Sequence, residues 1–127
     1  MADHEINLNI PLLRAIQAKI KEEPGMFTMS AWHMSAYRGC LGEVYHCGTA
    51  HCIGGWAQVL SGATVSNIGV ERAAMEALGL TREQANRLFY NVDWPEPFHL
   101  EYEMAKGHAE RADVAIRRIE HLINTGE

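Results

Sequence analysis

The feature that most constrains the fold is the repeated spacing of apolar residues by three and four positions. Toward the end of the chain this spacing is clearest on one face of a segment from about residue 109 to 124, formed by Ala112, Ala115, Ile116, Ile119 and Ile123. Residues spaced in this way line up on one side of an α-helix and indicate that this side is buried. Similar patterns recur earlier, separated by glycine and proline. The sequence therefore predicts an all-α fold.

We expect five or six helices in one compact domain spanning residues 1–127, because a chain of 127 residues has the size of a single domain. Asn9 is a suitable N-cap for the first helix, and Thr81 with Gln84 forms a capping-box pattern. An irregular loop or a small hairpin is expected at about residues 26–48. The helices before the last one are expected at about residues 9–23, 50–61, 67–78, 82–90 and 96–106.

Charge and composition exclude several classes of partner. The formal net charge is −5, from 16 acidic and 11 basic residues spread along the chain. Without a basic stripe, duplex nucleic acid is a poor candidate partner. No apolar run approaches the roughly 18 residues of a membrane helix, and the first residues do not resemble a signal peptide. The expected location is the cytoplasm, and the odd number of cysteines, Cys40, Cys47 and Cys52, fits reduced thiols or a metal site.

The segment Cys47–Ala57 concentrates the residues that can carry chemistry. It contains two cysteines, one histidine, three glycines and one tryptophan. We expect a helix to begin here, with Thr49 as its N-cap and Cys52 in its first turn. Gly54 and Gly55 inside a helix cost about 1 kcal/mol each relative to alanine, which indicates a close approach of another backbone or of a ligand.

Three functions fit this segment. The first is ligand binding without chemistry, because a capped helix N-terminus attracts anions. The ligand would be small and anionic or derived from a nucleotide, and a protein partner is the other possibility in this class. No cofactor is expected for this function. The candidate binding residues are Cys47, Thr49, His51, Cys52, Gly54, Gly55, Trp56, Trp94, Arg118 and His121.

The other two functions are a zinc site and a cysteine enzyme. Zinc would be held by ligands from Cys40, His46, Cys47, His51 and Cys52, although two cysteines separated by four residues depart from the usual zinc-knuckle spacing. In an enzyme, Cys52 would be the nucleophile, because a position in the first turn of a helix stabilises a thiolate. Its base would be His51, His33 or His121. The sequence alone leaves both alternatives open.

The cysteine segment also carries a family resemblance. Cys-Gly-Thr-Ala-His-Cys-Ile-Gly-Gly-Trp-Ala, at residues 47–57, resembles the C-G-T-x-x-C-I-x-G-W-A motif of a group of short bacterial and phage proteins. Segments nearer the C-terminus, such as Trp-Pro-Glu-Pro-Phe at residues 94–98, are similar to the C-terminal part of the proteins in that group. The resemblance covers most of residues 27–126, with residues 34–46 as an extension. It implies a shared organisation, and it favours a non-catalytic, phage-associated protein that sequesters a ligand or a host protein.

Overall fold

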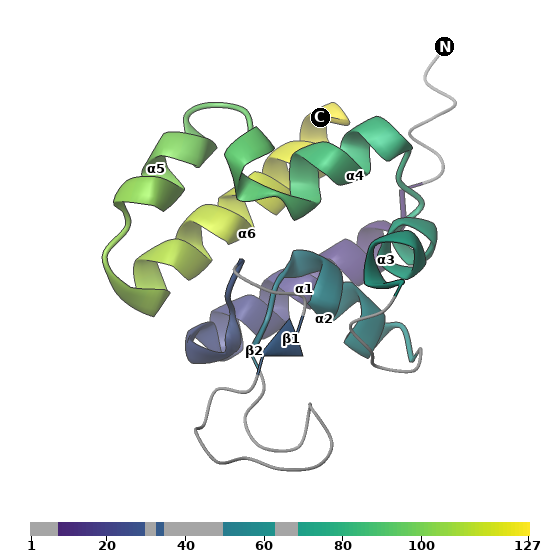
Figure 1. Cartoon of the computed structure of the whole chain (residues 1–127), viewed down its shortest axis with the longest axis horizontal. Coiled ribbons are helices and arrows are strands. Elements are labelled where there is room, and N and C mark those ends of the chain that lie inside the picture. The colour runs from purple at the N-terminus through teal and green to yellow at the C-terminus, as the bar shows by residue number, and fades with distance from the viewer. Residues whose placement is uncertain (1–7, 30–32, 35–49, 63–68) are drawn as a thin grey trace.

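The computed structural model describes residues 8–29, 33–34, 50–62 and 69–127. Within these ranges the chain forms six α-helices, which confirms the all-α prediction (Figure 1). The helices are α1 (Ile10–Glu22), α2 (Ile53–Leu60), α3 (Val70–Leu78), α4 (Arg82–Phe89), α5 (Phe98–Met104) and α6 (Gly107–Thr125). Two 3₁₀ turns, η2 (Pro24–Met26) and η3 (Asn91–Asp93), and two short strands, β1 (His33–Met34) and β2 (Ala50–His51), complete the described elements.

The long helix α6 packs against helices on two of its sides. It packs against α5 on one side and against α1 on the other, and α1 in turn packs against α2, which lies on α3 (Figure 1). None of the helices in the described ranges is long and apolar enough to cross a membrane. The apolar faces of these helices meet in one core that includes Leu13, Ile16, Ile20, Ile53, Trp56, Leu78, Leu88, Ile119 and Leu122.

The helix ends follow the local sequence signals. The Asn9 side chain accepts a hydrogen bond from a backbone N–H in the first turn of α1 at 3.1 Å, as predicted. At the start of α4, Thr81 and Gln84 exchange side-chain to backbone hydrogen bonds of 2.9 and 3.1 Å, which confirms the capping box. Gly79 and Gly126 follow α3 and α6 with φ angles of 70° and 79°, a conformation that favours glycine.

The predicted start of α2 is wrong. The helix begins at Ile53, and its N-cap is Cys52 instead of Thr49, which lies outside the described residues. The residues just before Cys52 form β2, which pairs antiparallel with β1 so that His51 lies opposite His33. Extended backbone that is paired in a strand cannot also form a helical turn. This long-range pairing therefore moves the start of the helix toward the C-terminus, to Ile53. Most of the loop or hairpin predicted at residues 26–48 lies outside the described residues.

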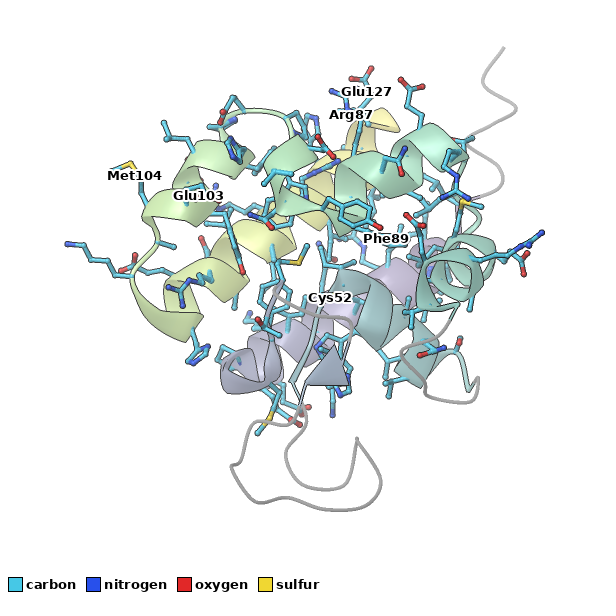
Figure 2. The ribbon with its side chains drawn as sticks, viewed as in Figure 1. Cys52, Arg87, Phe89, Glu103, Met104 and Glu127 are labelled. Atoms are coloured by element: carbon cyan, nitrogen blue, oxygen red, sulfur yellow. The ribbon has the colours of Figure 1, made fainter. Side chains whose placement is uncertain are left out.

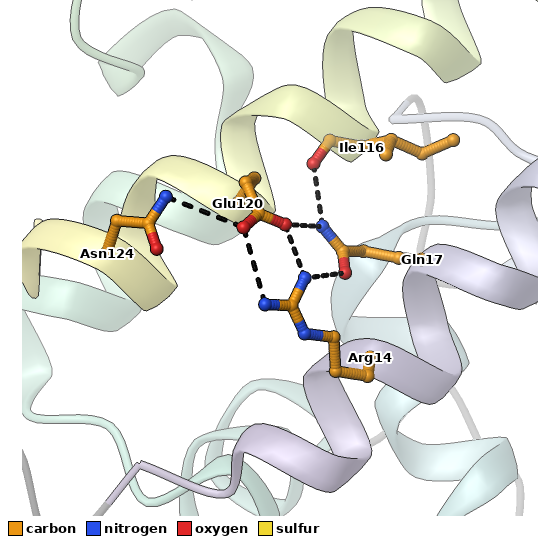
Figure 3. A network of polar contacts seen from close by, with 5 residues as sticks. All are labelled: Arg14, Gln17, Ile116, Glu120 and Asn124. Atoms are coloured by element: carbon orange, nitrogen blue, oxygen red, sulfur yellow. Dashed lines mark hydrogen bonds and ion pairs between the residues drawn. The ribbon is translucent and has the colours of Figure 1, made fainter.

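A polar network joins α1 to α6 on the outside of the core (Figure 3). Arg14 on α1 forms an ion pair with Glu120 on α6. The buried Gln17 donates one hydrogen bond to the carbonyl oxygen of Ile116 at 3.0 Å and another to the Glu120 carboxylate at 3.2 Å. Hydrogen bonds from Arg14 and Gln17 hold the pKa of Glu120 below its ordinary value.

This network predicts an acid-sensitive contact between α1 and α6. A carboxylate with a lowered pKa in the folded state stabilises the fold above its ordinary pKa of 4.5, and this contribution is lost as the pH falls through the folded-state value. Glu120→Gln should therefore destabilise the protein at neutral pH and make its stability less sensitive to acid. Urea unfolding at neutral and acidic pH measures this, with the exposed Glu83→Gln as control. Parallel pH dependences of Glu120→Gln and the unmodified protein would contradict the prediction.

Candidate functional site

The start of α2, where the sequence places the binding site, lies inside the protein. The side chain of Cys52 is only 3% exposed, and its Sγ accepts a hydrogen bond from the N–H of Gly55 at 3.3 Å. The neighbouring His51 is also buried. Figure 2 shows Cys52 in the middle of the projected molecule, among the helices. The helix N-terminus is therefore a covered position and not an open anion site.

Burial also changes the chemistry of Cys52. It raises the pKa of the thiol to about 11, and this effect exceeds the opposing hydrogen bonds from the N–H groups of Gly55 and Gly54. This direction is opposite to that of an activated thiolate, because removal of the sulfur from water outweighs its place at a helix start. The proposed base, His51, packs its ring on Trp56 with 4.4 Å between the ring centroids.

We expect Cys52 to resist alkylation in the folded protein. A pKa near 11 in place of 9.0 lowers the thiolate fraction at neutral pH about a hundredfold. The test uses a chain in which Cys40 and Cys47 are replaced by serine, so that iodoacetamide reports on Cys52 alone. Labelling should be slow in buffer and complete in denaturant.

The matched control for alkylation is an exposed cysteine in an otherwise cysteine-free chain. Ser61→Cys provides one, because Ser61 is exposed directly after α2. This variant should react quickly in the folded state. Labelling of Cys52 as fast as Ser61→Cys in buffer would contradict the burial and would restore the argument for a nucleophile.

The glycine pair and the tryptophan of the motif also belong to the interior. Gly54, Gly55 and Trp56 are all buried in α2, which packs against α1 and α3. The Lys19 ammonium lies 5.7 Å from the centroid of the Trp56 ring. The glycines are therefore buried in a helix that packs against two others, and this favours close packing over ligand approach as their role.

Trp94 packs in the core instead of lining a ligand site. Its indole N–H donates to the carbonyl oxygen of Leu88 at 2.8 Å, and its ring meets the edge of Tyr102 at a centroid distance of 5.2 Å. Only 3% of Trp94 is exposed. Its polar and apolar parts are both satisfied by the fold, as is common for a buried tryptophan.

The structure also separates the two predicted charge partners from the start of α2. Arg118 is fully buried, and its Nη2 donates to the main-chain oxygens of Arg87 and Glu127 at 2.8 and 2.7 Å. Arg87 and Glu127 lie together, apart from Cys52 in Figure 2. The ring of His121 packs on Phe98 with 5.3 Å between centroids. Both residues have roles in helix packing around α6.

The zinc alternative depends on residues that are not described. Cys40, His46 and Cys47 lie outside the described residues, and His51 and Cys52 are the two candidates within them. Among the described residues no group of three or more histidine, cysteine, aspartate or glutamate side chains is arranged to hold a metal ion. The described part of the motif therefore supplies at most half of a tetrahedral ligand set.

An open groove between α5 and α6 is a candidate site that we did not predict from the sequence. It has a volume of about 540 Å³, and two large apolar side chains at its edge are exposed, Leu100 by 56% and Met104 by 69%. These two residues are four positions apart and share a face of α5. The remaining lining residues are Glu101, Ala105, Ala109, Glu110, Asp113, Val114 and Arg117.

A sequence signal for this groove exists in α5 itself. Phe98 and Tyr102 are four positions apart, and so are Leu100 and Met104. A short helix at the edge of a core buries one face. A second apolar pair on a different face then remains at the surface. Phe98 and Tyr102 pack against the core, and the second pair is left at the surface.

Comparisons with protein-family models, with curated proteins and with solved structures give no match to this chain.

Proposed function

We propose that the chain is a non-catalytic binding protein that holds a partner protein in the groove between α5 and α6. The observation that carries this proposal is the exposure of Leu100 and Met104 beside an open volume of about 540 Å³. Large apolar side chains gathered at a concave surface are typical of interaction sites. Neither side chain belongs to the core cluster, so both are available for contact with another molecule.

The charges of the groove favour a protein over a small anionic ligand. Its lining carries the carboxylates of Glu101, Glu110 and Asp113 against one guanidinium, that of Arg117. Arg117 already pairs with Glu101 at 2.8 Å and with Asp113 at 3.0 Å. An anion would meet like charges here, whereas a protein segment can bring its own cations.

The protonation state of Cys52, the candidate nucleophile, supports the non-catalytic part of the proposal. With a pKa of about 11, the Cys52 thiol is protonated at neutral pH. Cys52 is a free thiol, which fits the reducing cytoplasm as the proposed location. Sequestration of a host protein is the form of binding that the phage-like motif suggests. Zinc present in stoichiometric amounts in the purified protein would replace this proposal with the zinc-binding alternative.

Site-specific photo-cross-linking in cells that naturally express the protein tests the proposal. A benzophenone amino acid replaces Leu100 and, as the matched control, Arg72, whose side chain is 81% exposed on α3. We expect a discrete protein adduct from position 100 that is absent from position 72. Adding Met104→Asp should remove the adduct, since a charge at this position is incompatible with an apolar contact.

The stability of the cross-linking variants is the necessary control. Substitutions at Leu100 and Met104 should change the free energy of unfolding by no more than about 0.5 kcal/mol, because both side chains are exposed. No adduct at position 100, or the same adducts at positions 100 and 72, would overturn the proposal. A persistent adduct in Met104→Asp would also place the contact elsewhere.

A further inference from the structure

We propose that the partner presents an amphipathic helix whose apolar stripe is flanked by lysine and arginine residues. This inference rests on the proposed function, because it names the partner of the same groove. Two properties of the lining support it, its helical walls and its charge.

The walls of the groove suit a helix. Leu100 and Met104 are spaced by about one helical turn along α5, and the opposite wall is the first half of α6. Ala105 and Ala109 contribute only methyl groups to the lining, so a partner can approach the backbone closely at these two positions. A groove between two helices with regularly spaced apolar contacts is the recognition mode of amphipathic helices.

The rim of the groove selects a basic partner. Asp113 and Glu101 share the guanidinium of Arg117, which leaves the rim with an excess of negative charge. Glu110 adds a third carboxylate, and one of its oxygens accepts a hydrogen bond from the backbone N–H of Lys106 at 2.8 Å. Lysine or arginine on either side of an apolar stripe would pair with these carboxylates at the edge of the groove.

The same charges disfavour a second copy of this chain as the occupant. A copy docking its own α5 would bring Glu101 and the exposed Glu103 against the acidic rim. Its net charge of −5 would add to the repulsion. A basic helix is favoured on both counts.

Two probe peptides of about 15 residues test the inference. Both carry the same leucine stripe in helical spacing, with lysine on the flanks of one and glutamate on the flanks of the other. Binding to the full chain is followed by amide chemical shifts and by titration. We expect the lysine peptide to shift the amides of α5 and of the first half of α6, and the glutamate peptide to bind at least about tenfold more weakly.

Variants of the chain separate the apolar and the charged contributions. The double variant Leu100→Ser and Met104→Ser should weaken the lysine peptide at least about tenfold. Neutralising the rim with Glu110→Gln and Asp113→Asn should weaken it severalfold and reduce its dependence on salt. The matched control removes an exposed carboxylate elsewhere, Glu83→Gln on α4, and should leave binding unchanged.

The outcomes distinguish the inference from the proposed function. If both peptides bind in the groove equally well, the charge inference is overturned and the groove remains a protein-binding site. If neither peptide shifts the amides of α5 and α6, the inference is overturned, and the adduct at position 100 decides the proposed function separately. If the lysine peptide binds on another face, or if Glu83→Gln weakens it as much as the rim variant does, the inference is also overturned.

Discussion

Arg118→Ala is expected to lower the free energy of unfolding by about 3 kcal/mol, one of the two largest effects of a single substitution that we predict. The Arg118 side chain is fully buried in α6, and its Nη2 is bonded to two main-chain oxygens, those of Arg87 and Glu127. Alanine leaves these oxygens without their donor and leaves a cavity where the side chain lay. Urea unfolding followed by circular dichroism measures the loss.

Arg118→Met is the matched control, because it keeps most of the volume and removes the charge. Burial lowers the pKa of Arg118 to about 10, a sign that the charged form is poorly accommodated. Its Nε and Nη1 are also buried without a hydrogen-bond partner among the described residues. Removing these donors offsets part of the lost hydrogen bonds, so methionine should cost only about 1 kcal/mol. A methionine variant as unstable as the alanine variant would show that the donated hydrogen bonds, and not the volume, dominate.

Trp56→Ala is expected to cost about 4 kcal/mol, the other large effect. The Trp56 residue is 4% exposed, and its ring contacts the His51 ring and has the Lys19 ammonium 5.7 Å from its centroid. Alanine would leave a cavity in the core at the packing position of α2. Circular dichroism is the suitable probe, because replacing a tryptophan also changes the fluorescence.

Trp56→Phe separates the volume of the indole from its N–H group. The Trp56 Nε1 is buried and has no hydrogen-bond partner among the described residues. Phenylalanine keeps a ring against His51 and removes this unsatisfied donor, so it should cost about 1 kcal/mol. A loss as large as that of Trp56→Ala would mean that the indole N–H is essential, and would contradict a packing role.

The variants at Arg118 and Trp56 should differ from the groove variants in which property they change, stability or partner binding. Substitutions at Arg118 and Trp56 act on folding, because both side chains are buried. Substitutions at Leu100 and Met104 should leave folding nearly unchanged and act on partner binding, because both side chains are exposed. Measuring stability and peptide binding for all four positions therefore tests whether the tryptophan motif is structural and the groove functional.

The sequence predicted those features that depend on near neighbours in the chain. The N-cap at Asn9 and the capping box of Thr81 with Gln84 are formed by contacts within a few residues. Helical periodicity likewise predicted the all-α class. Each of these signals is local, so it can be interpreted without knowing the rest of the fold.

Contacts between segments that are distant in the sequence determine which candidate site residues are buried and which are exposed. The pairing of β2 with β1 moves the start of α2 to Ile53 and makes Cys52 its N-cap. Packing of the helices then buries Cys52 and raises its pKa, and buries Arg118 against the main-chain oxygens of Arg87 and Glu127. The same packing leaves Leu100 and Met104 at the surface. The sequence by itself determined which segments are helical, and only the tertiary structure decided which side chains meet water, because burial depends on residues that are far apart in the chain.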